Sequence, residues 1–513
     1  MLQVKNLTIT HKKDLRVLLD GFSFVLNHGD KAVIIGEEGN GKSTLLKWIY
    51  NPEMVSDYID ANGERIIDKE RLGYLPQELP RDQEGMTVYE YFTQDEVFWD
   101  KNPKELHELT GKLSLPADFF YGNQLMGSLS GGEKIKAQLL KVMIQEPTVL
   151  LLDEPSNDID IETLEWLEKF ISDSSEAILF VSHDEVLIEN TANVIVHIEQ
   201  LRRKTQSRYS VMRMTYDEYV RFRDANMRNQ EALAISQRRE QKIKDEKIRK
   251  IEQSVEHAQA TISRKDPHGG KLLKKKMHAV KSMEKRYERE KDEMAEVPEA
   301  ESAMNIKIGD ADSAVPSGKT VIDFSLDRLL CPDGSRELSR DIRLFLRGSE
   351  KVCILGKNGV GKSTLIKMIA DEMLSRKDLH AEYMPQNYED LLIGDLTPVS
   401  FLSKTGEKEE VTKIRTYLGS MKFTTEEMDH KLSDLSGGQR AKIFLLKMSL
   451  SDANVLILDE PTRNFSPLSG PVIRRVLKDF PGAIISISHD RKYIDEVCEK
   501  KYLLTEKGLE KIG

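Results

Sequence analysis

The sequence predicts an α/β protein of two similar domains joined by an antiparallel helical hairpin, and three observations lead to this prediction. An ordered set of short motifs occurs twice, once within residues 1–200 and once within 317–513. In each copy, a β-branched apolar segment precedes a glycine-rich loop and a helical pattern follows it. Between the copies lies a long basic segment in which Gly and Pro occur only at one turn cluster.

The repeat is defined both by its motifs and by their spacing. Ser130 and Ser436 each lie 23 residues before the Asp of an Asp-Glu pair, and each of these Asp residues lies 30 residues before a histidine. Two sets in register indicate a duplicated domain. In order, the copies contain Gly36–Ser43, Gln77, Leu129–Gly132, Asp153-Glu154 and His183, and then Gly356–Ser363, Gln386, Leu435–Gly438, Asp459-Glu460 and His489.

Each glycine-rich loop is typical of a phosphate-binding loop. The loop that follows the strand-like segment 31–35 has glycines that allow backbone N–H groups to converge on phosphate oxygens at a positive helix end. Lys42 is placed to contact the β- and γ-phosphates, and the Ser43 hydroxyl can ligate Mg²⁺. Lys362 and Ser363 are predicted to do the same after the second segment, 351–355.

In each copy a run of aliphatic residues, typical of a buried parallel strand, ends in two carboxylates. Ligands of open α/β sheets bind beyond the carboxyl ends of the strands. Asp153 and Asp459 are therefore predicted to hold Mg²⁺ through water. Glu154 and Glu460 are predicted to polarise an attacking water.

A histidine follows the next apolar strand of each copy. A single histidine at the end of a strand is more often a packing residue. Because His183 and His489 recur at matched spacing, we predict that both contact the γ-phosphate.

The phosphate loop, Gln, Leu-Ser-Gly-Gly, Asp-Glu and His together resemble the ATP-binding cassette superfamily, of which Leu-Ser-Gly-Gly is the distinguishing mark. In that family two cassettes pack head to tail, and each ATP lies between the phosphate loop of one and the Leu-Ser-Gly-Gly segment of the other. The resemblance implies an ATPase with ATP and Mg²⁺ as cofactors. The implied first site combines Gly36, Glu37, Glu38, Gly39, Asn40, Gly41, Lys42, Ser43, Thr44, Gln77, Asp153, Glu154 and His183 with Ser436, Gly437 and Gly438. The implied second site combines Gly356, Lys357, Asn358, Gly359, Val360, Gly361, Lys362, Ser363, Thr364, Gln386, Asp459, Glu460 and His489 with Ser130, Gly131 and Gly132. The expected metal ligands are Ser43, Gln77, Asp153, Ser363, Gln386 and Asp459.

The two copies differ in the loop after the Asp-Glu pair. In the first copy this loop ends in Asp160, as in the family pattern, whereas Ser466 takes the same place in the second. Since this loop reaches the opposite phosphate loop in the family, we expect the two sites to hydrolyse ATP at different rates. No aromatic residue that could stack on adenine is evident before either phosphate loop, so the preference for ATP over GTP rests on the resemblance.

The segment between the copies predicts two long helices. Residues 201–266 and 271–297 contain no Gly or Pro, and the cluster Asp266–Gly270 between them predicts a turn. Apolar residues recur at alternating steps of three and four, which predicts an antiparallel coiled coil. These residues are Ile248, Ile251, Val255, Ala258 and Ile262 on the first helix and Leu273, Met277, Val280 and Tyr287 on the second.

This segment is basic in an otherwise acidic chain. Arg238–Lys291 contains 18 Lys and Arg against 9 Asp and Glu, a net charge of +9, which leaves −19 on the rest of a chain whose total is −10. A charge run is often only a solvated face, but a basic bend on an acidic protein suits a phosphate backbone. Because no aromatic residues interleave there, we expect contacts to the shape and phosphates of structured RNA. The predicted RNA-binding residues are Arg264, Lys265, His268, Lys271, Lys274, Lys275 and Lys276.

Tandem cassettes with a long basic helical linker and no membrane segment resemble the ABC-F family of translational ATPases. The resemblance implies a ribosome partner, with the linker near the tRNA exit site in contact with rRNA and the P-site tRNA. It also implies a role in translation regulation or in antibiotic resistance by ribosome protection, with the two cassettes paired within one monomer. The predicted fold class is therefore α/β, with two P-loop ATP-binding cassette domains (1–205 and 301–513) joined by an antiparallel α-helical coiled-coil hairpin (206–300, tip near 264–276).

Other classes of protein explain the sequence less completely. A fused ATPase subunit of a membrane transporter would have tandem cassettes, but it gives no reason for the basic hairpin. A DNA-repair or chromosome-organising ATPase would carry its coiled coil inside one cassette. No apolar run approaches the ~20 residues of a membrane span, no signal-peptide pattern opens the sequence, and Cys331, Cys353 and Cys498 fit no disulfide or zinc spacing. We therefore expect a cytoplasmic protein with no membrane partner.

Overall fold

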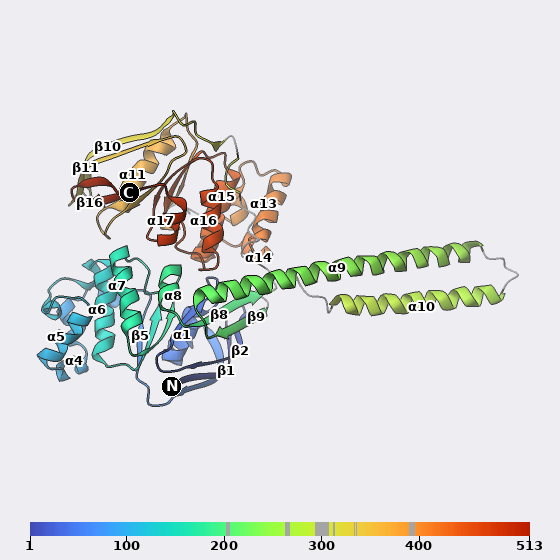
Figure 1. The fold of residues 1–513 in the computed structure, drawn as a ribbon, viewed down its shortest axis with the longest axis horizontal. Helices are drawn as coiled ribbons and strands as arrows, with labels where there is room; N and C mark the ends of the chain where they lie inside the picture. Colours follow the sequence, from blue (N-terminus) through green and yellow to red (C-terminus); the bar gives the residue numbers. More distant parts are fainter. Residues whose placement is uncertain are drawn as a thin grey trace. The chain divides into compact units, whose positions relative to one another are not determined.

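The computed structural model describes residues 1–201, 206–261, 267–292, 307–310, 313–332, 334, 336–388 and 395–512. The chain divides into two compact units, one made of Met1–Tyr216 with Glu301–Gly513 and the other of Asp217–Ala300. The first unit contains two α/β domains of similar build (Figure 1). We call them cassette 1, the described residues up to 216, and cassette 2, the described residues from 307 onward.

Cassette 1 is built around a six-stranded sheet of order β5-β6-β7-β3-β8-β9, in which only β9 runs antiparallel to its neighbour. All residues of β3, β6 and β7 are buried, as expected for the interior of a parallel sheet. The loops after these three strands therefore leave the same edge of the sheet. The strands are β1 Leu2–His11, β2 Val17–Leu26, β3 Lys31–Ile35, β4 Ile59–Ile67, β5 Leu72–Leu75, β6 Val149–Asp153, β7 Ala177–Val181, β8 Val194–Leu201 and β9 Gln206–Met212.

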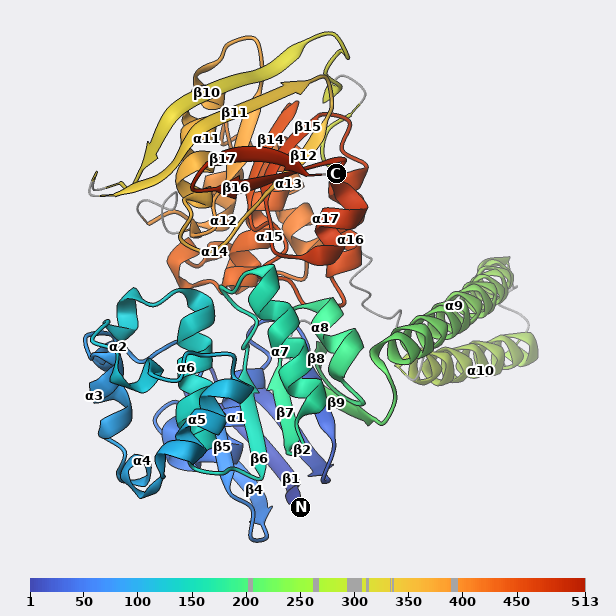
Figure 2. The ribbon, with the colours of Figure 1, turned by 60° about the vertical axis from the view of Figure 1, so that its left-hand side comes forward.

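A second, antiparallel sheet of order β2-β1-β4 completes the core of cassette 1. Helix α1 lies between the two sheets, and Leu45, Leu46 and Ile49 are fully buried against both (Figure 2). This packing fixes the helix that follows the phosphate loop. The helices are α1 Lys42–Tyr50, α2 Arg81–Glu84, α3 Val88–Thr93, α4 Glu96–Asp100, α5 Pro103–Lys112, α6 Gly131–Ile144, α7 Ile161–Asp173 and α8 Glu185–Thr191.

Cassette 2 repeats this arrangement, which confirms the predicted duplication. Its six-stranded sheet has the order β13-β14-β15-β12-β16-β17, and the two-stranded sheet β10-β11 covers α11. The strands are β10 Thr320–Leu330, β11 Glu337–Arg347, β12 Lys351–Leu355, β13 Ala381–Met384, β14 Val455–Asp459, β15 Ala483–Ile487, β16 Lys500–Thr505 and β17 Gly508–Ile512. The helices are α11 Lys362–Ser375, α12 Pro398–Leu402, α13 Lys408–Ser420, α14 Thr425–Asp429, α15 Gly437–Leu450, α16 Gly470–Lys478 and α17 Arg491–Val497.

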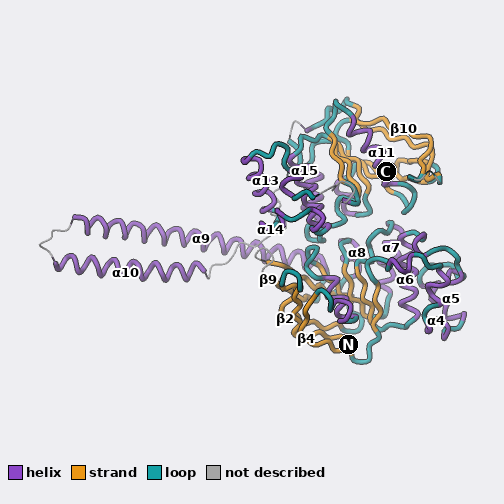
Figure 3. Tube along the Cα trace, turned by 180° about the vertical axis from the view of Figure 1, so that it is seen from behind, coloured by secondary structure: helices purple, strands orange, loops and turns teal. Residues whose placement is uncertain are grey.

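The other unit is a pair of helices, α9 (Tyr216–Thr261) and α10 (Pro267–Asp292), which run side by side in opposite directions (Figures 1 and 3). Ile248, Val255 and Val280 of the predicted apolar stripe are only 8%, 5% and 4% exposed. A helical hairpin with this buried stripe is the linker fold that the sequence predicts. Strand β9 falls at the start of the segment predicted as linker, but it pairs with β8 in the sheet of cassette 1.

The turn prediction for Pro267–Gly270 is wrong, because these residues form the first turn of α10. Proline is favoured at the first position of a helix, where its missing N–H would have no partner and its fixed φ suits the helix. The preceding residues 262–266 lie outside the described part of the chain.

Ion pairs between helices join the two cassettes. Arg474 Nη1 on α16 lies 2.6 Å from Glu185 Oε1 on α8, and both side chains are almost fully buried, at 3% and 7% exposed. Lys492 on α17 also contacts Glu185, at 3.1 Å. Arg491, beside it, contacts Glu168 and Asp184 of cassette 1. These contacts hold α7 and α8 of cassette 1 against α16 and α17 of cassette 2, near the candidate sites.

Candidate functional site

The first phosphate loop turns from β3 into the start of α1. Gly41 precedes the helix with φ of 88°, a left-handed conformation that favours glycine, and no side chain caps the first turn. Lys42 Nζ is buried and donates to the carbonyls of Gly36 and Glu37, at 2.9 and 3.1 Å. Burial lowers the pKa of Lys42, although the carboxylates nearby oppose this effect. Uncapped amides and a folded-back lysine form a cradle that suits phosphate oxygens. Of the other predicted loop residues, Asn40 donates to the Ile198 carbonyl at 3.1 Å, and Gly39, Ser43 and Thr44 line the adjoining cavity.

The Asp153 carboxylate lies at the end of β6, directly beside this cradle. Its Oδ1 accepts a hydrogen bond from the Ser43 hydroxyl at 2.7 Å, and its Oδ2 accepts one from the Tyr74 hydroxyl at 3.1 Å. Burial raises the pKa of Asp153, and the negative Glu154 adds to this effect. The predicted metal ligands Ser43 and Asp153 thus lie together. The third, Gln77, donates to Glu154 at 3.3 Å instead.

Glu154 is held by a small network. His183 Nε2 lies 3.2 Å from Glu154 Oε1, and the Asn157 amide donates to Oε2 at 2.6 Å. Burial alone would raise the pKa of Glu154, but His183 and Lys42 outweigh it and bring the pKa to about 2. Glu154 is therefore a carboxylate at neutral pH, the state that a general base requires.

The second phosphate loop repeats this geometry. Lys362 Nζ donates to the carbonyls of Gly356 and Lys357, at 2.7 and 3.0 Å. Gly361 precedes α11 with φ of 101°, again without a side-chain cap. Val360 packs against the core of cassette 2. Gly359, Ser363 and Thr364 line the adjoining cavity with Gln386.

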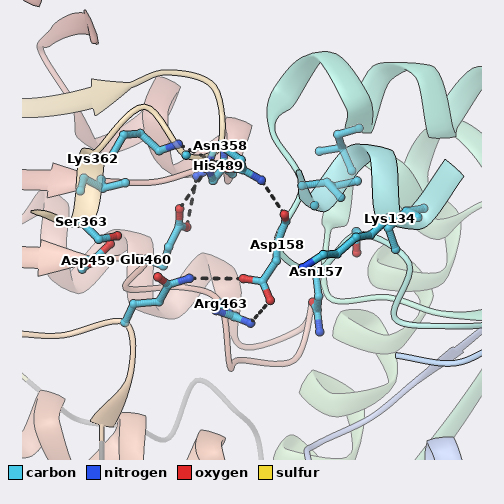
Figure 4. A pocket seen from close by; sticks show the side chains of 18 of the residues that line it. Lys134, Asn157, Asp158, Asn358, Lys362, Ser363, Asp459, Glu460, Arg463 and His489 are labelled. Carbon is cyan, nitrogen blue, oxygen red and sulfur yellow. Dashed lines mark hydrogen bonds and ion pairs between the residues drawn. The ribbon is translucent and has the colours of Figure 1, made fainter. Parts of the chain in front are cut away.

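The carboxylates of the second site have different surroundings (Figure 4). Burial, with Asp459 beside it, raises the pKa of Glu460 to about 8, and burial raises that of Asp459 to about 6. His489 Nε2 lies 3.7 Å from Glu460 Oε1, and burial, with Lys362 nearby, lowers the pKa of His489 to about 4. In the first site His183 lowers the pKa of Glu154, whereas the His489 side chain has no comparable effect on Glu460 in the second.

Each Leu-Ser-Gly-Gly segment begins a helix that faces the phosphate loop of the other cassette. Ser130 caps α6 and Ser436 caps α15, each by accepting the amide of the third helical residue. The Asn358 amide of the second phosphate loop lies near Gly131 and donates to the Asp158 carbonyl at 2.5 Å. The predicted residues of each site thus come together from both cassettes, with Gly132 and Gly437 in the same two helix starts.

Sequence reasoning missed Asp158, which lies between three groups of cassette 2 (Figure 4). Its carboxylate accepts hydrogen bonds from Arg463 Nη2 at 2.7 Å and from Gln386 Nε2 at 3.3 Å. Gln386, a predicted metal ligand, therefore points to the opposite cassette. The sequence offers one signal: in the loop after the Asp-Glu pair, the second copy has the positively charged Arg463 where the first copy has the neutral Asn157.

Five of the predicted RNA-binding residues lie on α10. Lys271, Lys274, Lys275 and Lys276 are exposed on α10, and His268 belongs to its first turn. Arg264 and Lys265 lie outside the described residues.

The residues present fit a magnesium nucleotide. Both carboxylate oxygens of Asp459 and Nδ1 of His489 are buried without a hydrogen-bond partner, which suits a bound cation and an additional polar ligand. A cavity of about 710 Å³ spans the second phosphate loop and the start of α6. Within the described ranges, no group of three or more His, Cys, Asp or Glu could hold a metal alone. The residues that would hold Mg²⁺ together with phosphate oxygens are Ser43 and Asp153 in the first site and Ser363 and Asp459 in the second.

None of the helices in the described part of the chain is long and apolar enough to cross a membrane.

Comparisons with known proteins agree with this geometry. A profile of the family described as "ABC transporter" matches residues 19–157 and 339–463. The chain is 27% identical over 504 residues to the ribosome protection protein VmlR of Bacillus subtilis (strain 168), covering 95% of this chain and 84% of that protein. It is 26% identical over 506 residues to the ATP-binding protein Uup of Buchnera aphidicola subsp. Acyrthosiphon pisum (strain APS), covering 96% and 78%. The Arabidopsis thaliana ABC transporter F family member 5 is 27% identical over 392 residues, covering 74% and 51%. Among solved structures, the archaeal ribosome recycling factor aABCE1 in complex with the stalk protein aP1 has the same fold, with a TM-score of 0.56 at 18% identity, covering 99% of this chain and 89% of that one.

Proposed function

Because this chain belongs to the ATP-binding cassette family, and within it to the ABC-F proteins, it is an ATPase, and we propose that ATP binding and hydrolysis control its association with the ribosome. ATP-driven closure of the cassettes positions the basic hairpin of α9 and α10 against ribosomal RNA and the P-site tRNA near the exit site. The activity serves translation regulation or antibiotic resistance by ribosome protection, and the protein works as a cytoplasmic monomer with its own two cassettes paired.

In this proposal each ATP binds between a phosphate loop and the Leu-Ser-Gly-Gly helix of the other cassette. The backbone amides at the uncapped starts of α1 and α11 bind the phosphates together with Lys42 and Lys362, because an uncapped helix start favours anions. Ser43 and Asp153 would hold Mg²⁺ in the first site, and Ser363 and Asp459 would hold it in the second, where the ion would polarise the terminal phosphate.

Hydrolysis requires a water aligned with the terminal phosphate. In the first site Glu154 accepts the proton of this water as it attacks, and in the second site Glu460 takes this role once it is deprotonated, because burial raises the pKa of its carboxyl to about 8. His183 and His489 contact the γ-phosphate and orient it. The hydrogen bonds of Glu154 to His183 and Asn157 restrict its rotamers, which supports its role as the base of the first site.

The observation that carries the ribosome proposal is the alignment with a ribosome protection protein along 95% of this chain, basic helical segment included. A fused transporter ATPase would need tandem cassettes but not the excess of lysine on the exposed face of α10. A phosphate-rich partner explains this excess, since counterions released from RNA phosphates favour such contacts.

The test is a hydrolysis-deficient trap. We expect Glu154→Gln combined with Glu460→Gln to lower ATP turnover by about 100-fold or more, because a general base contributes that much. The trapped protein should co-sediment with ribosomes in ATP, as measured through a sucrose cushion. The matched control is Lys42→Ala with Lys362→Ala, which removes the phosphate contacts and should not co-sediment. A trapped variant that stays in the supernatant would contradict the proposal.

A further inference from the structure

Glu38 of the first phosphate loop lies on the helix start where the first site would receive the terminal phosphate. One of its carboxylate oxygens, Oε2, accepts a hydrogen bond from the Gly438 amide at the start of α15. A β-carbon added at Gly438 would be 2.8 Å from Oε2, and one added at Gly437 would be 3.3 Å from Oε1. Both carboxylate oxygens therefore lie over the first turn of α15.

The chemistry of this contact is that of an anion on a helix N-terminus. Helix α15 has 14 residues, and Ser436 caps the amide of Gln439, the third helical residue. The amide of Gly438 is left for another acceptor, and an anion is favoured there by the helix dipole. Neighbouring Glu37 lies within 3.7 Å of Lys422 and 3.6 Å of Lys442, which holds the loop against cassette 2.

Glu38 also divides the first composite site. A cavity of about 220 Å³ on its one side is lined by the phosphate loop with Glu154 and His183. A cavity of about 30 Å³ on its other side is lined by Ser436 and Gly438. Both cavities have Glu38 in their walls, so the carboxylate stands between the two halves that ATP must bridge.

The second phosphate loop has no carboxylate at the matching position. The position of Glu38 is taken there by Asn358, whose neutral amide donates to the Asp158 carbonyl. One cavity of about 710 Å³ reaches both the second phosphate loop and Gly131 of α6. At this matched position the two sites differ. The carboxylate of Glu38 occupies the start of α15 in the first site, whereas the neutral Asn358 lies beside the start of α6 in the second.

We propose that Glu38 is an intramolecular competitor of the γ-phosphate, so that ATP completes the first site only by displacing it from α15. This inference rests on the two-site assignment proposed above and adds its regulation. ADP, which has no γ-phosphate, does not compete for the same amide. The second site therefore fills first, and the first site binds ATP with lower affinity and with a weaker preference for ATP over ADP.

The test measures nucleotide binding by the full chain with the second site disabled by Lys362→Ala. In this background we expect Glu38→Asn, which installs the residue of the second site, to tighten ATP binding about tenfold, since a charge-assisted hydrogen bond no longer has to be broken. ADP binding should change less than about threefold. Glu38→Gln keeps the length of the side chain without its charge, and its ATP affinity should lie between that of Glu38→Asn and that of the chain with Glu38. The affinities are measured by titration with fluorescent ATP and ADP analogues.

Glu64→Asn is the matched control, because it removes one exposed negative charge from strand β4 of the same cassette. It should leave both affinities unchanged. Equal gains for ATP and ADP from Glu38→Asn would indicate general charge repulsion and would overturn the inference, as would no gain for ATP. If the unsubstituted chain binds no ATP at all, the proposed function fails and this inference fails with it.

Discussion

Single residues make the two sites unequal, and the matched pair Asp160 and Ser466 shows how. Asp160 caps α7 by accepting the Thr163 amide at 2.9 Å. Burial opposes its ionisation, but hydrogen bonds from Thr163 and from the backbone N–H of Asn358 in the opposite phosphate loop lower the pKa of Asp160 overall. Ser466 is buried and shares a 2.9 Å hydrogen bond with the Ser469 hydroxyl of its own cassette. Of these two matched residues, Asp160 contacts the phosphate loop of the other cassette with a carboxylate, whereas Ser466 is bonded within its own cassette.

We predict that Asp160→Asn slows turnover at the second site by roughly three- to tenfold, because the contact with the phosphate loop loses its charge. Stability should change little, since Asn caps a helix as well as Asp does. Asp160→Ala, which also removes the cap, should cost about 1 kcal/mol in the free energy of unfolding. ATP hydrolysis in a Glu154→Gln background isolates the second site. Equal turnover with and without the Asp160→Asn substitution would contradict the assigned contact.

The sequence predicts which residues gather at each site but not what they bind when they meet. Lys42, Ser43 and Asp153 come together because the motifs follow β3 and β6, which lie on either side of β7 in one parallel sheet. Strand order is a regular property of such folds. Glu38 and Asp158 make their contacts to the other cassette, and those depend on side-chain positions that no local pattern encodes. Their charges were visible in the sequence, but their partners were not.

At the scale of elements, the hairpin was predictable because its pattern is long and regular. Ile248 and Val255 lie two turns apart on α9, and Val280 of α10 is buried with them. The end of the hairpin was less predictable, since Pro and Gly mark turns in most sequences while Pro also begins helices. A local preference with two outcomes cannot place a boundary by itself.

We predict that replacing Lys274, Lys275 and Lys276 with Gln weakens ribosome binding and reduces its salt dependence. Each lost phosphate contact should lower the slope of log affinity against log salt by about 1. The measurement is co-sedimentation of the trapped variant over a series of KCl concentrations. The matched control replaces three exposed lysines of α9 that lie further from the bend, namely Lys242, Lys247 and Lys250. An effect of the same size in the control would show that the position of the charge near the bend does not matter.

At the scale of the molecule, the ion pairs between the cassettes all run in one direction among the described residues. Cassette 1 supplies the acid and cassette 2 the base in each of them. A set of interactions with one polarity fixes which face meets which. The pairs are Glu37 with Lys422 and Lys442, Asp158 with Arg463, Glu162 with Lys357, Glu168 and Asp184 with Arg491, Glu185 with Arg474 and Lys492, and Glu189 with Lys492.

The buried pair of Glu185 and Arg474 should dominate this interface. We predict that Glu185→Gln lowers the free energy of unfolding by about 3–5 kcal/mol, because it leaves the Arg474 charge buried without its main partner. The same arginine also contacts Glu496 at 2.9 Å, a side chain that is 47% exposed. Glu496→Gln is therefore the matched control and should cost less than about 1 kcal/mol. Urea unfolding of both variants provides the comparison, and similar losses would mean that burial of the pair is unimportant.

This polarity has a consequence for how the protein is made. A chain is synthesised from its amino terminus, so cassette 1 is complete while cassette 2 is still being added. Several unfinished chains emerge close together when one message is read by several ribosomes at once. Each exposes the same acidic face, and like charges placed opposite one another repel. This repulsion disfavours pairing between the cassette 1 domains of neighbouring unfinished chains. Each cassette 1 then pairs with the basic face of cassette 2 from its own chain.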